Sequence, residues 1–145
     1  PLNGLGMAGV APNVRLVNLR AGQDSGYFFL QPSVDALTFA ADNGVDVVNM
    51  SYFIDPWLYN CTDNPADSAT QQLEQRTIIE ATTRALEYAR KNGVTLIAAA
   101  GNEHTDMDNP TVDTISPDFP PGTAYTRAVD NSCLTMPTEG PNVVS

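Results

Sequence analysis

Three short apolar runs alternate with two helix-like stretches, and this alternation constrains the fold more than any other feature of the sequence. The apolar runs are Val14–Leu19, Val45–Met50 and Val94–Ala99. Short runs rich in Val and Leu are typical of strands in a parallel sheet that is buried on both faces. We therefore expect an α/β chain, a parallel sheet with flanking helices, in the order βαβαβ with right-handed crossovers.

The two predicted helices span Ser33–Asn43 and Ala69–Asn92, and each is closed by an Asn-Gly pair. Glycine accepts the left-handed backbone conformation that commonly ends a helix. Ser33 is the expected N-cap of the first helix, and Ser68 with Gln71 matches a capping box for the second. Function in such a sheet lies at the carboxyl ends of the strands. The segments that follow the strands are therefore the candidates for a site.

Composition excludes several classes of function. The chain of 145 residues has 7 Lys plus Arg against 17 Asp plus Glu, for a net charge of −10, so nucleic acid is a poor partner. No apolar run approaches the roughly 18 residues of a membrane helix, so no membrane partner is expected. The chain lacks an initiator Met and stops on the strand-like Val143-Val144-Ser145. We interpret residues 1–145 as a single partial domain of a longer protein.

Two irregular stretches interrupt this pattern, an insertion at about 53–68 and a region at about 103–141. Each carries one of the two cysteines, Cys61 and Cys133. Two cysteines are too few for a disulfide scaffold or a tetrahedral zinc site. Their number leaves open whether they pair or remain two free thiols.

The second irregular stretch also holds the only histidine. His104 forms a His-x-Asp-x-Asp pattern with Asp106 and Asp108. Binding of a divalent cation needs more ligands in a fixed geometry. We therefore favour a solvated loop over a metal site here.

The string Ala98–Glu103 is the most informative for chemistry. Small residues run off the end of a buried strand, and the Asn102 amide that follows is suited to stabilise a developing oxyanion. A tight turn in which Asn102 bonds its own backbone explains the same string. This string by itself favours the turn.

Three strings shift that balance together: Gly9-Val10-Ala11-Pro12, Val47–Ser51 and Ala98–Glu103, in this order and with βαβ spacing. Together they resemble the central part of a subtilisin-like serine endopeptidase, a subtilase. The resemblance covers residues 1 to about 103 and continues more weakly to Ser145. It implies that the chain is the middle of a three-layer catalytic domain that hydrolyses peptide bonds.

The resemblance also implies roles for individual residues. Asn102 matches the oxyanion-hole asparagine of the family. The implied substrate-binding residues are the two walls of the primary specificity pocket, Ser51, Tyr52 and Phe53 opposite Ala99, Ala100 and Gly101, and an edge segment for the substrate backbone, Asp24, Ser25 and Gly26. Asn3, with the carbonyl groups of Leu5 and Met7, matches part of a structural calcium loop.

Departures from the family pattern limit what this chain does alone. None of the three triad residues is present, because neither Ser51 nor His104 occupies a triad position. Tyr52-Phe53-Ile54 replaces the usual Leu-Gly-Gly, which alters the pocket. We expect no hydrolysis by the isolated chain, and the rest of the parent catalytic domain as its partner, together with a protein or peptide substrate.

The resemblance further implies an extracellular, secreted protein, and an oxidising compartment favours a disulfide between Cys61 and Cys133. Two alternatives to a protease fragment remain. One is a catalytically dead subtilase relative used for binding. The other is a small-ligand-binding α/β module, although the first apolar run is not followed by a glycine fingerprint.

Overall fold

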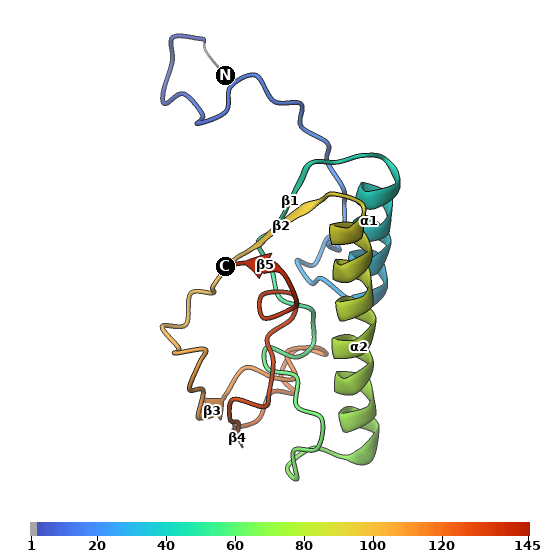
Figure 1. Ribbon diagram of the computed structural model, residues 1–145. Helices are drawn as coiled ribbons and strands as arrows, with labels where there is room; N and C mark the ends of the chain where they lie inside the picture. The colour runs from blue at the N-terminus through green and yellow to red at the C-terminus, as the bar shows by residue number, and fades with distance from the viewer. Residues whose placement is uncertain (1–2) are drawn as a thin grey trace.

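The computed structural model describes residues 3–145 and contains two helices and two small sheets (Figure 1). The elements are α1 (Leu30–Asp42), β1 (Val47–Met50), α2 (Ala69–Lys91), β2 (Thr95–Ala98), β3 (Val112–Asp113), β4 (Arg127–Ala128) and β5 (Val143–Val144). A parallel sheet has the order β1-β2-β5, and β3 pairs with β4 in a separate antiparallel pair. The predicted α/β class, a parallel sheet with flanking helices, is confirmed.

The sheet is buried on one face only. β1 pairs with β2 so that Val48 lies opposite Leu96 and Met50 opposite Ala98. Met50 and Leu96 are buried under the helices, whereas Val47 and Ile97 are 53% and 37% exposed. The expectation that both faces are covered is therefore wrong for the described residues, because α1 and α2 lie side by side on the same face of the sheet (Figure 1).

The predicted first strand, Val14–Leu19, is not a strand in the structure. The segment is irregular and its apolar side chains are exposed, with Leu16 at 92%. A strand needs a hydrogen-bonded neighbour, and no strand among residues 3–145 pairs with this segment. The third parallel strand is instead β5, which pairs with β2 through Leu96 and Ile97.

The helix boundaries follow the predicted caps in three of four places. Ser68 and Gln71 form the expected capping box, and Gly44 and Gly93 take positive φ angles of 67° and 91° after the two helix ends. Helix α1 begins earlier than predicted, with Phe29 as its N-cap. Ser33 is not the cap, because its hydroxyl lies within the helix and donates to the Phe29 carbonyl at 3.0 Å.

The two irregular stretches are packed rather than loose. Ile54 and Trp57 of the insertion and Met136 of the later stretch join the core that α1, α2 and the sheet form. The Ile54 N–H donates to the Met136 carbonyl at 2.8 Å, and Asn60 exchanges backbone hydrogen bonds with Leu134. The stretches at 53–68 and 103–141 thus lie together beyond the carboxyl ends of β1 and β2.

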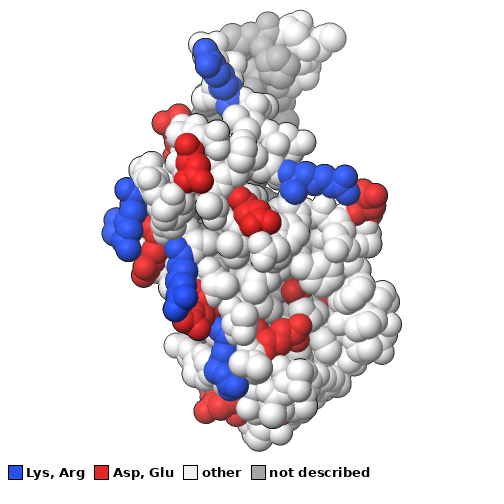
Figure 2. Space-filling model, turned by 90° about the vertical axis from the view of Figure 1, so that its right-hand side faces the viewer, with Lys and Arg blue, Asp and Glu red and all other residues white. Residues whose placement is uncertain are grey.

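The surface over the helices is polar. Figure 2 shows basic and acidic side chains interspersed on this side of the molecule, and α2 carries the exposed ion pairs Arg84–Glu80 and Lys91–Glu87. Within the described residues, neither helix is both long and apolar enough to cross a membrane.

Candidate functional site

A pocket of about 370 Å³ opens at the carboxyl ends of β1 and β2. The residues that directly follow the two strands form its rim, as expected for a parallel sheet. Its lining includes nine of the predicted site residues: Ser25, Gly26, Ser51, Tyr52, Phe53, Ala99, Ala100, Gly101 and Asn102. The structure therefore brings together segments that are about 25 and 50 residues apart in the chain.

Both predicted pocket walls are anchored to the sheet. The Ala99 N–H donates to the Met50 carbonyl at 3.2 Å, which continues the β1–β2 pairing into the wall. The Thr138 hydroxyl donates to the Ala99 carbonyl at 2.9 Å from the opposite side. The wall of small residues is thus held through both backbone polar groups of Ala99.

Asn102 lies at the exposed rim of this pocket. Its backbone N–H donates to the Glu103 carboxylate at 2.8 Å. Gly101 has φ 89°, and a Cβ placed there would lie 2.7 Å from the same carboxylate, so the turn requires glycine. This turn leaves the Asn102 side chain without an intramolecular hydrogen bond in the described chain.

Only part of the edge segment Asp24–Gly26 lies in the pocket. Ser25 and Gly26 line it, whereas Asp24 faces a separate shallow hollow. Asp24 pairs there with Arg20 at 2.5 Å, and both side chains are exposed. Asp24 is therefore not part of the pocket lining.

An aromatic cluster lies beside this edge, and its members Tyr27, Phe28 and Tyr52 line the pocket. Of the cluster, the sequence predicted only Tyr52. Phe28 stacks on Tyr52 with ring centroids 4.2 Å apart and an interplanar angle of 7°. Tyr27 and Phe29 meet Phe119 edge-on. Burial raises the pKa of the Tyr52 hydroxyl, so this ring stays neutral. The run Tyr27-Phe28-Phe29 directly after Gly26 was the available signal.

Two aspartates, Asp55 and Asp118, form a carboxyl pair in the pocket, which we call the acid pair. Burial is the main cause that raises the pKa of Asp55 to about 7, and the neighbouring Asp118 carboxyl raises it further. Burial also raises the pKa of Asp118. The Phe28 N–H donates to Asp55. The neighbouring carboxyl groups act in opposite directions, so Asp55 is the member of the pair that keeps its proton to the higher pH.

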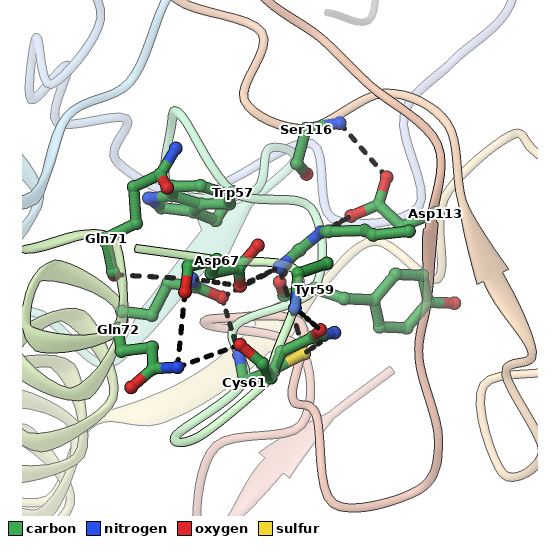
Figure 3. Close-up of polar contacts among 12 residues, drawn as sticks. Trp57, Tyr59, Cys61, Asp67, Gln71, Gln72, Asp113 and Ser116 are labelled. Atoms are coloured by element: carbon green, nitrogen blue, oxygen red, sulfur yellow. Dashed lines mark hydrogen bonds and ion pairs between the residues drawn. The ribbon is translucent and has the colours of Figure 1, made fainter. Parts of the chain in front are cut away.

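A second, deeper cluster surrounds Arg127, whose side chain is fully buried behind the pocket wall. Its guanidinium pairs with Asp67 and Asp113, both at 2.8 Å, and also donates to the Tyr59 carbonyl. Asp67 and Asp113 lie on opposite sides of this cluster, with Trp57 on the side of Asp67 (Figure 3). The guanidinium carbon lies 4.7 Å from the Trp57 ring centroid, a cation–π contact.

The Arg127 cluster fixes the pocket wall because its members also hold backbone groups. Asp113 accepts from the Ile115 and Ser116 N–H groups, and the Ser116 hydroxyl accepts from the Leu58 N–H at 2.7 Å. Burial alone would raise the pKa of Asp113, but Arg127 and these donors outweigh it and hold the pKa below its ordinary value. Leu58 and Tyr59, which both line the pocket, are thereby tied to this cluster.

Cys61 and Cys133 form a disulfide at the edge of the same cluster. The bond joins the stretches 53–68 and 103–141 across a sequence separation of 72. The Cys61 N–H also donates to the buried Gln75 side chain at 2.7 Å. The insertion is thus tied to α2 as well as to the later stretch.

The predicted calcium residues lie far from the pocket, in the irregular segment before α1 (Figure 1). Asn3, Leu5 and Met7 are exposed, and the Asn3 side-chain oxygen accepts from the Leu5 N–H at 3.1 Å. Calcium takes 6–8 oxygen ligands, so these three residues do not form a calcium site by themselves. No group of three or more His, Cys, Asp or Glu side chains in residues 3–145 is arranged to hold a metal, His104 with Asp106 and Asp108 included.

Comparison with known proteins agrees with this geometry. The model of the subtilase family matches residues 2–136. A thermophilic serine proteinase from Bacillus sp. (strain AK1) is 35% identical over 100 residues, which are 69% of this chain and 20% of that protein. Subtilisin DY from Bacillus licheniformis is 29% identical over 110 residues, which are 76% of this chain and 32% of that protein.

A solved structure supports the fold as well. The crystal structure of a lanthipeptide protease superposes with a TM-score of 0.54 at 20% identity, covering 88% of this chain and 29% of that chain. The chain thus spans between a fifth and a third of the length of these relatives. Because the family match covers both helices, the strands β1 and β2 and the two walls of the pocket, the chain belongs to the subtilase family.

Proposed function

We propose that this chain is part of a secreted serine endopeptidase and contributes the substrate pocket and the oxyanion donor Asn102. The observation that carries the proposal is the pocket itself. It places Asn102 beside the two walls, Ser51–Phe53 and Ala99–Gly101, at the carboxyl ends of two paired strands. Family membership supports a relation to serine peptidases, and peptides or proteins as substrates.

The chemistry assigned to this chain is binding and charge stabilisation. The remainder of the catalytic domain supplies a serine nucleophile, a histidine base and an aspartate that orients the histidine. As the serine attacks, the substrate carbonyl oxygen becomes negative, and the Asn102 amide donates a hydrogen bond to it. Ser25 and Gly26 pair with the extended backbone of the substrate.

Two further parts of the proposal concern the protein's surroundings. The disulfide supports an extracellular location, because such bonds form and persist in oxidising compartments. A structural calcium ion near Asn3, Leu5 and Met7 remains part of the proposal, with most of its ligands supplied from outside residues 3–7.

The proposal is tested with the complete gene product that contains this chain. We expect it to hydrolyse casein and to lose this activity after treatment with a serine-directed fluorophosphonate. We expect residues 1–145 alone to be inactive. A complete protein that binds peptides without hydrolysing them would instead identify a subtilase relative used for binding.

A further inference from the structure

The charged groups of the pocket are all acidic. Asp55, Asp118 and Glu103 line it, and no Lys or Arg is among its lining residues. The seven basic residues of the chain lie elsewhere: Arg76, Arg84, Arg90 and Lys91 on α2, Arg15 and Arg20 before α1, and Arg127 in its own buried cluster. The basic side chains on the helix side of the molecule are visible in Figure 2. The pocket therefore has acidic groups that no basic side chain in residues 3–145 balances.

The acid pair is also incompletely satisfied. Asp118 Oδ1 is buried and has no hydrogen-bond partner, and neither member of the pair takes part in an ion pair of the described chain. A buried carboxylate oxygen without a partner is costly, and paired charges or hydrogen bonds normally compensate it. A bound donor with positive charge would supply this compensation.

The walls around the acid pair suit a long basic side chain. Tyr27, Phe28, Tyr52 and Tyr59 offer aromatic surface. The alkyl stem of Lys or Arg packs on such surface while its charged end reaches a carboxylate, and a guanidinium also stacks on aromatic rings. Arg127 shows the same combination inside this chain, with two aspartates at 2.8 Å and an aromatic ring at 4.7 Å.

We propose that Asp55 and Asp118 make this end of the pocket selective for a positively charged side chain, Lys or Arg, of a peptide substrate. The inference rests on the proposed function, since it names the substrate class of the same pocket. Two neighbouring carboxyl groups resist carrying two negative charges at once, so the pair matches one monocation. Replacement of both carboxyl groups abolishes the selectivity.

The test uses a peptide library in which each position is varied in turn, with the complete gene product and three variants: Asp55→Asn, Asp118→Asn and the double variant. At one position we expect Lys or Arg to exceed Gln and Met in kcat/KM. A lost charge-assisted hydrogen bond corresponds to roughly a 10- to 100-fold effect, so the double variant should lose about that much on basic peptides. The loss on basic peptides should exceed any loss on neutral peptides, because only a basic side chain pairs with the carboxyl groups.

A matched control makes the same two Asp→Asn replacements outside the pocket. Asp63 and Asp106 come from the same two stretches and are exposed, so Asp63→Asn with Asp106→Asn should leave the preference unchanged. Asp55→Asn alone and Asp118→Asn alone guard against a double variant that fails to fold. An unchanged basic preference in the folded single and double variants would overturn the proposal.

Calorimetric binding of benzamidine separates this inference from the proposed function, because it needs no catalysis. We expect benzamidine to bind the complete protein and the charge control, and to bind the double variant at least about tenfold more weakly. If benzamidine binding is lost in the double variant but the complete protein hydrolyses no peptide, the selectivity of the pocket is supported and the protease function is refuted. Hydrolysis with no basic preference and no benzamidine binding would refute the selectivity and support the protease.

Discussion

Two pairs of aspartates, built from the same two stretches of chain, have opposite surroundings. Asp67 and Asp113 hold Arg127 between them, whereas Asp55 and Asp118 lie in the pocket without a basic partner. In the first pair the pKa of Asp113 is lowered, and in the second the pKa of Asp55 is raised to about 7. The comparison shows that a buried pair of carboxyl groups stabilises the fold where the chain supplies a cation between them. Where the chain supplies no cation, the pair is available to bind a ligand.

The largest expected effect comes from removing the cation of the first pair. Arg127→Met leaves Asp67 and Asp113 buried without a counter-charge, and breaking a buried ion pair in this way costs about 3–5 kcal/mol of unfolding free energy. Urea denaturation of the complete protein measures it. The control is Arg84→Met, which removes an exposed pair with Glu80 and should cost less than about 1 kcal/mol. An equal loss of unfolding free energy in the two variants would show that the Arg127 cluster does not stabilise the fold more than an exposed ion pair does.

The disulfide should have the next largest effect. It links the two stretches that carry both acid pairs, and a closed loop of 72 residues contributes up to about 4 kcal/mol in the chain-entropy model. Cys61→Ser with Cys133→Ser should lower the urea midpoint to that of the reduced wild type, and a reductant should not lower it further. Two free thiols per chain in unreduced, denatured protein would contradict this prediction.

The smallest predicted effect is on the pH dependence of stability, which should differ between the two aspartate pairs. The raised pKa of Asp55 means that stability falls as the pH rises from 3.8 to about 7, where the unfolded chain has lost a proton that the folded chain keeps. Asp55→Asn should therefore stabilise the protein at pH 8, with little effect below pH 4.

Asp113 should behave in the opposite way. Its lowered pKa gives a contribution that is full above its ordinary value of 3.8 and is lost as the pH falls below it. Asp113→Asn should therefore destabilise the protein at pH 8. Melting curves at pH 4 and pH 8 check both variants. If Asp55→Asn and Asp113→Asn shift the melting temperature in the same direction at pH 8, the two pairs do not differ as proposed.

Local sequence signals predicted the elements that depend on local chemistry. The capping box at Ser68, the Asn-Gly helix ends and the parallel pairing of the two longer strands all follow from short patterns. Val14–Leu19 has an equally good strand pattern but forms no strand, because pairing depends on a neighbour that a pattern cannot supply. Ser33 was misjudged because a serine bonds the preceding turn as readily as it caps a helix.

The pocket was partly predictable for the same reason. Its rim follows strand ends, so Ser51–Phe53, Ala99–Gly101 and Asn102 were found together. Asp55 and Asp118 were not, because they are far apart in the sequence and meet only when the two irregular stretches pack. Arg127 gave no signal either, since a single arginine in an irregular stretch is usually exposed.

The central claim is that the pocket is the substrate cleft of a serine endopeptidase with Asn102 as its oxyanion donor. The most direct measurement compares kcat and KM of the complete protein with those of Asn102→Ala. Asn109→Ala, an exposed asparagine in the same loop but outside the pocket lining, is the control.

An oxyanion donor acts on the transition state and not on ground-state binding. We therefore predict that Asn102→Ala lowers kcat by about 10²–10³, a figure carried over from subtilisin, while KM changes little. Asn109→Ala should leave both constants near their wild-type values. A loss confined to KM, or no loss at all, would contradict the claim.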